Sequence, residues 1–391
     1  MVLHAFTDNP DGADPTYGLI FAPSGGPSDD LYGTTPNGGT QFSGDVFELA
    51  PNGSGGWTYN VIYTFTDCRV ACYPAGPLAT DGTNLYGASS IGGVHNNGAI
   101  FEMTRGSDGT WSVQTIYSFE NKPDGQNPNG VVYYKGSLYG TTANGGKYEG
   151  GTVFAVTSSG DGTWSENVIH HFEENDTDGN GPMGGVVFDA KGNLYGMTSM
   201  GGPNQAGTVF ELTLTSGGLW QEHILHSFDV TDGLMPWYAT PIFDKQGNLY
   251  GTTSLGGSGQ YGTVFELTRS GAEWTETVLY NFAGGEDGAN PNSGVSIDSE
   301  GRLYGATVLG GGRGDCTDQS TQNLYCGTVF LLTPSQSGPW AISYLHRFAD
   351  STDGAEPSAG VILDSRDNVY GVASHSGTAS GVVFELSHPP R

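Results

Sequence analysis

One short pattern recurs along this chain at a nearly constant interval. Leu-Tyr-Gly, or Val-Tyr-Gly in the last copy, starts at residues 31, 85, 138, 194, 249, 303 and 369. The steps between copies are 54, 53, 56, 55, 54 and 66 residues. A second motif, of the type Gly-Thr-Val-Phe-Glu-Leu, follows every copy, and a stretch from Trp to Phe follows six of them. A repeat of this length indicates supersecondary units that bury their apolar surfaces against one another.

Each unit contains the pattern of four short β-strands, A to D. In the fourth unit these are residues 185–188, 194–198, 207–212 and 220–228, which are rich in β-branched and aromatic residues. No segment has a sustained helical period. Four strands per unit at this period are typical of a β-propeller blade. The sequence therefore predicts an all-β fold, a single seven-bladed β-propeller over residues 1–391, with four antiparallel strands per blade.

The two ends of the chain predict how the ring closes. Residues 2–6 match the second half of strand D in other units, such as residues 278–282, and the last unit lacks a Trp strand of its own. The N-terminal strand is therefore expected to complete the last blade, which removes open sheet edges. On this interpretation Met1 starts a trimmed chain, and any signal peptide or surface anchor lies outside this sequence.

Composition excludes several classes of protein. Glycine accounts for 65 of 391 residues, which fits tight turns between many short strands, and 12% aromatic residues can supply a core. No apolar run approaches the ~18 residues of a membrane span. With 13 Lys and Arg against 41 Asp and Glu, the net charge is -28. Such a charge repels phosphate backbones and argues against a nucleic-acid partner.

Two repeat motifs together resemble a known bacterial repeat family. The stretches LYGTTSLGG…YGTVFEL at 249–267 and LYGTTANGG…GGTVFAV at 138–156 are similar to the GloVer repeat, a choice-of-anchor tandem repeat. The resemblance covers essentially the whole chain. It implies a propeller-like fold and extracellular display by a bacterium. It implies little about activity, and no family active site can be transferred to this chain. The insertions in the second and sixth units depart from the pattern.

Four cysteines form two local pairs in the sequence, and three pairings of them are possible. The pairing Cys68–Cys72 and Cys316–Cys326 is favoured over a metal site, because no nearby His pair completes either spacing. Disulfides agree with a secreted or cell-surface protein.

Aromatic side chains that break the repeat are the main candidates for ligand binding. Most units have small residues after the proline that precedes strand A. The exceptions are Trp237 and Tyr238 in the fifth unit and Tyr17 in the first. In the second unit Tyr73 lies just before the proline, and all four aromatic residues are near the expected mouth of the central channel. Aromatic rings with polar tips suit stacking on sugar rings. The alternative is that they plug the channel or pack between blades.

Charged loop residues on the same face give further candidates. Arg69 and Arg313 could bind a carboxylate such as a uronic acid, or could only balance local charge. A ring of Asp-Gly-x-x-Pro motifs starts at Asp11, Asp124, Asp178, Asp232, Asp287 and Asp353. The ring could bind Ca²⁺, but turns that fix the loops are favoured. No metal or other cofactor is therefore predicted.

No known catalytic motif is present in the sequence. If the protein is an enzyme, a glycoside hydrolase or a polysaccharide lyase, the candidate residues are Tyr148, Glu149, His95 and Asp315. The leading hypothesis is a secreted or cell-surface module that binds an extracellular polysaccharide or other glycan. A structural protein that mediates surface assembly is a third hypothesis. A monomer that does not span a membrane is expected.

Overall fold

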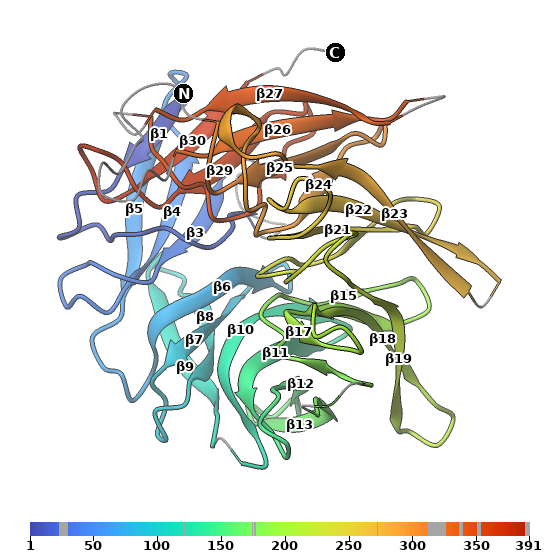
Figure 1. Ribbon diagram of the computed structural model, residues 1–391. Helices are drawn as coiled ribbons and strands as arrows, with labels where there is room; N and C mark the ends of the chain where they lie inside the picture. Colours follow the sequence, from blue (N-terminus) through green and yellow to red (C-terminus); the bar gives the residue numbers. More distant parts are fainter. Residues whose placement is uncertain are drawn as a thin grey trace, which may run out of the picture.

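Seven four-stranded antiparallel sheets make up the protein in the computed structural model, which describes residues 1–22, 30–120, 122–173, 175, 177–271, 273–311, 326–335, 339–349 and 353–387. Figure 1 shows the sheets following one another in chain order around the molecule. The predicted seven-bladed β-propeller is confirmed. No described helix is long and apolar enough to cross a membrane.

The strands of each blade follow the order A to D from the channel outward. Blade 1 comprises β2 (Ile20–Phe21), β3 (Leu31–Thr35), β4 (Asp45–Pro51) and β5 (Trp57–Thr64). Blade 2 comprises β6 (Cys72–Thr80), β7 (Leu85–Ile91), β8 (Ala99–Arg105) and β9 (Trp111–Ser118). Blade 3 comprises β10 (Gly125–Tyr134), β11 (Ser137–Gly145), β12 (Thr152–Ser158) and β13 (Trp164–His171). Blade 4 comprises β15 (Val187–Phe188), β16 (Leu194–Thr198), β18 (Thr208–Leu214) and β19 (Trp220–Ser227).

Blades 5 to 7 continue the same order. Blade 5 comprises β20 (Ile242–Phe243), β21 (Leu249–Thr253), β22 (Thr263–Ser270) and β23 (Glu273–Asn281). Blade 6 comprises β24 (Val295–Ile297), β25 (Leu303–Thr307), β26 (Thr328–Thr333) and β27 (Ala341–Arg347). Blade 7 comprises β28 (Ile362–Leu363), β29 (Val369–Ala373), β30 (Val382–Leu386) and β1 (Val2–Ala5). A short ladder joins β14 (Gly179–Asn180) to β17 (Met200–Gly201), and η1 (Gly285–Asp287) is a single 3₁₀ turn.

Strands B and C explain why the two motifs recur together. In blade 5, Tyr250 pairs with Glu266 and Gly251 pairs with Phe265 across the ladder. The Tyr250 hydroxyl donates to the Glu266 carboxylate at 2.7 Å. A Cβ on Gly251 would lie only 2.6 Å from Cζ of Phe265. Glycine is therefore needed in Leu-Tyr-Gly because the phenylalanine ring of strand C lies directly over it.

The same phenylalanine also joins neighbouring blades. The Phe that follows strand D of one blade meets the strand C Phe of the next at ring-centroid distances of 5.0 to 5.4 Å. These pairs are Phe6–Phe47, Phe65–Phe101, Phe119–Phe154, Phe172–Phe210, Phe228–Phe265, Phe282–Phe330 and Phe348–Phe384. Each pair lies in or beside a buried cluster that spans two blades, so the apolar contacts run around the whole ring.

The N-terminal strand closes the ring as the sequence predicts. β1 pairs antiparallel with β30, and Phe6 is fully buried. The Phe6 N–H donates to the carbonyl of Gly381 at 2.9 Å. Strand D of blade 7 therefore comes from the opposite end of the chain from strands A to C.

One buried carboxylate interrupts a regular contact between strands B and C. In four blades two Thr hydroxyls hydrogen-bond across these strands at 2.8 to 2.9 Å, the pairs being Thr142–Thr152, Thr198–Thr208, Thr253–Thr263 and Thr307–Thr328. In blade 1 the partner of Thr35 is Asp45, which is fully buried. Both Asp45 carboxylate oxygens are hidden from solvent, and the Thr64 side chain interacts with the carboxylate. Burial, aided by the charge of Asp11, raises the pKa of Asp45 to about 6.

Replacing Phe6 with alanine should weaken ring closure. The change leaves a cavity at the interface between blades 7 and 1, and losing a buried Phe costs about 3–5 kcal/mol. Denaturant unfolding of Phe6→Ala measures this loss. The control is Phe42→Ala, because Phe42 is 57% exposed and should change the free energy of unfolding by under ~0.5 kcal/mol. Equal effects of the two substitutions would contradict closure through β1.

Replacing Asp45 with threonine should stabilise the protein at neutral pH. The folded state keeps a proton on Asp45 that the unfolded chain has lost, so the wild-type free energy of unfolding falls as pH rises from about 4 to about 6. Asp45→Thr removes this fall and should be roughly 1–3 kcal/mol more stable at pH 7. Urea unfolding at pH 4 and pH 7 checks it, with Glu273→Thr on the exposed face of β23 as control. A stability difference that is the same at both pH values would refute the assignment.

Candidate functional site

A pocket of about 440 Å³ opens in the central channel where the A strands begin. Blades 1, 5, 6 and 7 supply nearly all of its lining. The lining residues are Thr16, Tyr17, Gly18, Leu19, Pro77, Tyr238, Thr240, Ile242, Asn292, Ser293, Val295, Ser296, Ser358, Ala359, Gly360, Val361 and Ile362. A second cavity of about 400 Å³ shares Leu19, Pro77 and Thr240 with it and continues along blades 2 to 4.

Tyr17 and Tyr238 come together at this pocket from blades 1 and 5. Tyr17 is half-buried, whereas Tyr238 is 44% exposed. Burial, together with the neighbouring Tyr238, raises the pKa of Tyr17 to about 12. Burial also raises the pKa of Tyr238. Both phenols are therefore protonated at neutral pH and offer a hydroxyl and an aromatic face.

An extra residue in blade 5 places Tyr238 in the pocket. In blades 1, 4, 6 and 7 the loop proline lies five residues before the strand A residue that pairs with Tyr of Leu-Tyr-Gly or Val-Tyr-Gly. In blade 5 Pro236 lies six residues before the corresponding Ile242. Tyr238 takes up the difference with φ of 54°, a conformation that a bulky residue rarely adopts. The Trp237 ring lies parallel to the Tyr238 ring at 5.9 Å but does not line the pocket.

The polar groups of the pocket are uncharged, and several are unpaired. Asn292 Oδ1, Ser293 Oγ and Ser358 Oγ are buried without a hydrogen-bond partner in the described part of the chain. The lining contains no Asp, Glu, His, Lys or Arg. Buried polar atoms usually find a partner, so these three can receive groups from a ligand. The arrangement suits a neutral ligand with an apolar face and several hydroxyls.

Tyr73 and Arg69 lie elsewhere, in and beside the disulfide loop. Cys68 and Cys72 form the predicted disulfide. Arg69 has an 85% exposed side chain and pairs with Asp67 at 2.7 Å. Hydrogen bonds from Arg69 lower the pKa of Asp67 to about 2. Tyr73 has φ of 54° and fixes the loop through its backbone, its N–H donating to Ser43 O at 2.9 Å.

The residues expected to act in catalysis are on the exposed loops of blades 2 and 3. His95 lies 3.4 Å from the Glu120 carboxylate. Glu149 forms an ion pair with Lys122, and the Tyr148 hydroxyl accepts a hydrogen bond from Lys147 at 2.7 Å. None of these side chains lines the pocket. The structure thus brings Tyr17 and Tyr238 together and leaves His95, Tyr148 and Glu149 apart from them.

Three predicted residues lie outside the described residues. These are Arg313, Asp315 and Cys316. Cys326 is buried and disulfide-bonded.

The sequence model of the Gloeobacter/Verrucomicrobia repeat family matches residues 55–237 and 214–390. The chain belongs to this family. The resemblance of the repeat motifs to that group is confirmed. No curated protein is similar enough in sequence to match this repeat protein.

Several solved structures share the fold of this Gloeobacter/Verrucomicrobia repeat protein. A candidate 6-phosphogluconolactonase from Bacteroides uniformis is 13% identical, with a TM-score of 0.56 over 88% of either chain. The periplasmic gluconolactonase of Pseudomonas aeruginosa is 12% identical, with a TM-score of 0.52 over 95% of this chain and 99% of its own. The extracellular domain of a candidate one-component system from Bacteroides thetaiotaomicron is 9% identical, with a TM-score of 0.57 over 99% of this chain and 40% of that one. At these identities the likeness shows the fold alone.

Sequence reasoning missed a recurring polar contact between blades of the repeat protein. The aspartates of Asp-Gly-x-x-Pro fix their own loops, as where Asp178 Oδ2 accepts the N–H of Glu173 at 2.8 Å. The same carboxylate also faces a side chain of strand D, His170 in blade 3. From the next blade Glu222 reaches the same place. In the sequence, the signal for this contact was a Glu two residues after the Trp of strand D. Only three units have a Glu at that position.

Proposed function

We propose that this protein is a glycan-binding module that takes a neutral sugar residue into the mouth of its central channel. The observation that carries the proposal is the meeting of Tyr17 and Tyr238 at an uncharged pocket of about 440 Å³. A pyranose ring has an apolar face that packs on an aromatic ring and hydroxyls that need hydrogen-bond partners. The unpaired atoms of Asn292, Ser293 and Ser358 can supply those partners.

The charge distribution favours a neutral glycan over a uronic acid. A carboxylate in the pocket would meet no Lys or Arg in the lining. Arg69, which the sequence offered for this role, is exposed and already paired with Asp67. A net charge of -28 adds a general repulsion of acidic polymers.

The pocket composition favours binding over acid–base catalysis. A glycosidase needs two carboxyl groups on either side of the scissile bond, and no carboxyl group lines the pocket. A pKa of about 12 makes Tyr17 a poor general base at neutral pH.

An extracellular location for the module is part of the proposal. The Cys68–Cys72 disulfide is of a kind that persists in oxidising compartments. The repeat family, whose resemblance implies extracellular display, supports the same location.

Replacing Tyr238 with alanine should weaken glycan binding about fivefold, because losing one aromatic contact costs on the order of 1 kcal/mol. The wild type is first screened on an array of neutral and acidic oligosaccharides. The affinity of the best neutral ligand is then measured by calorimetry for the wild type and for Tyr238→Ala.

Tyr148→Ala is the matched control, because Tyr148 is 39% exposed, similar to Tyr238, and lies outside the pocket. It should bind like the wild type. The proposal fails if no neutral glycan binds, or if Tyr238→Ala and Tyr148→Ala have the same affinity.

A further inference from the structure

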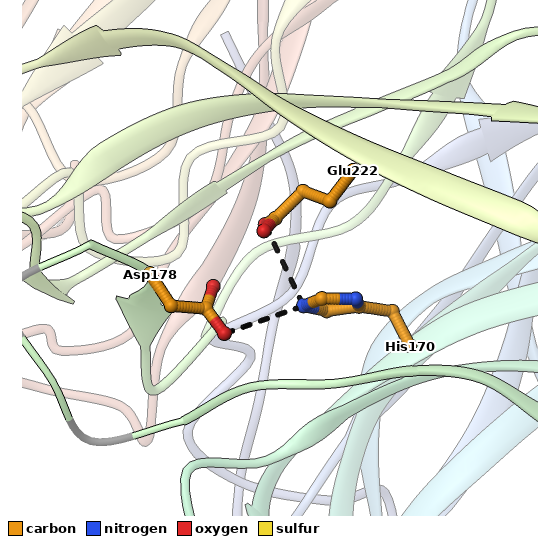
Figure 2. A group of neighbouring side chains, drawn as sticks. All are labelled: His170, Asp178 and Glu222. Atoms are coloured by element: carbon orange, nitrogen blue, oxygen red, sulfur yellow. Dashed lines mark ion pairs between the residues drawn. The ribbon is translucent and has the colours of Figure 1, made fainter.

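The interface between blades 3 and 4 holds three potential metal ligands that no role above uses. His170 is near the end of β13, Asp178 is in the loop that follows, and Glu222 is in β19 of the next blade. Figure 2 shows the His170 ring pointing between the two carboxylates, with an ion pair to each. One nitrogen and two carboxylate oxygens all lie within 4.8 Å of one another.

The donor atoms are buried and incompletely paired. His170 Nε2 lies 3.6 Å from Asp178 Oδ2 and 3.5 Å from Glu222 Oε1, both beyond hydrogen-bond distance. His170 Nε2 and Glu222 Oε1 are hidden from solvent, and neither has a hydrogen-bond partner among the described residues. Buried atoms of this kind normally have a partner, so His170 Nε2 and Glu222 Oε1 each have an unused lone pair that an ion can bind.

Equivalent positions at other blade interfaces show the His–Asp contact in a closed form. There, His4 Nε2 lies 2.9 Å from Asp11 Oδ2, and His346 Nε2 lies 3.0 Å from Asp353 Oδ2. At the first of these interfaces Tyr59 occupies the position of Glu222. The His–Asp hydrogen bond is therefore the ordinary state of this contact. Among the described interfaces that have this His and Asp, the bond is open only between blades 3 and 4.

The spacing matches a metal coordination sphere. In a tetrahedral zinc site with bonds of about 2.1 Å, neighbouring ligand atoms lie about 3.4 Å apart. The two distances at His170 are 3.5 and 3.6 Å. We propose that His170, Asp178 and Glu222 form a binding site for a first-row divalent metal ion, with Zn²⁺ the best fit, that joins blades 3 and 4.

The ligand types favour zinc at this site over the Ca²⁺ ion considered above for the ring of Asp-Gly-x-x-Pro motifs. Imidazole suits zinc and its neighbours in the first transition row, whereas Ca²⁺ takes six to eight oxygens. Backbone N–H groups of Glu173 and Gly179 donate to the Asp178 carboxylate at 2.8 and 2.6 Å, which holds its orientation. A cation would also offset the repulsion between the Asp178 and Glu222 carboxylates, which face the same point.

The next interface repeats the ligand set in a tighter form. His226, Asp232 and Glu276 lie within 4.8 Å of one another between blades 4 and 5. There the His226–Asp232 hydrogen bond is closed at 3.0 Å. Zinc must open this bond to enter, so we expect the second set to bind it more weakly than the first.

The substitution His170→Tyr tests the site with a side chain that the repeat already uses at the equivalent position. Tyr117 occupies this position between blades 2 and 3, where its hydroxyl donates to Asp124 at 2.8 Å, so the variant should fold. Purified protein is loaded with Zn²⁺ and freed of excess metal, and the zinc retained per chain is measured by mass spectrometry. The wild type should retain one equivalent more than His170→Tyr. Zinc should also raise the melting temperature of the wild type more than that of the variant.

His223→Ala is the control for loose surface binding, because His223 is exposed on β19, the strand that carries Glu222. It should retain as much zinc as the wild type. Cobalt loading adds a spectroscopic readout, because tetrahedral Co²⁺ absorbs strongly in the visible region. The proposal is overturned if the wild type retains no zinc, or if His170→Tyr retains as much as the wild type.

Discussion

The ring of paired phenylalanines is the contact on which the rest of this propeller depends. Each strand C Phe packs over the glycine of its own blade and against the Phe that ends the preceding blade. These rings are buried, so the interface loses contacts if either member becomes smaller. The motifs Leu-Tyr-Gly and Val-Phe-Glu-Leu are therefore two halves of one packing requirement. Phe6 meets that requirement from the other end of the chain, which makes closure part of the same packing.

The seven blade interfaces use the same phenylalanine contacts. Residues that depart from the repeat therefore fall at defined positions in a blade. Tyr17 and Tyr238 replace small residues at the start of strand A and therefore reach the channel. Glu222 and Glu276 lie on strand D and therefore reach the neighbouring blade. Departures on the inner strand alter the channel, whereas those on the outer strand alter the joint between blades. The proposed glycan pocket and the proposed metal site are independent for this reason.

Much of the fold could be predicted because its determinants lie close together in the sequence. Strand pairing within a blade joins residues such as Tyr250 and Glu266, which one unit contains. The Cys68–Cys72 disulfide is similarly local. The pocket was foreseen less well. Tyr17 and Tyr238 were candidates and meet there, whereas Tyr73 serves a turn and Trp237 lies behind Tyr238. The placement of Trp237 and Tyr238 depends on a one-residue change in loop length, and that of Tyr73 on its position before the proline; pattern matching resolves neither.

The amino-acid sequence by itself determined the number of blades, their strand order and the closure of the ring, because the spacing of apolar residues and glycines repeats seven times. Only the tertiary structure decided which side chains share a site. His170 and Glu222 belong to different repeats, and Tyr17 and Tyr238 to blades on either side of the channel. Their meeting depends on how far each blade is rotated about the axis, and that rotation is set by packing between blades.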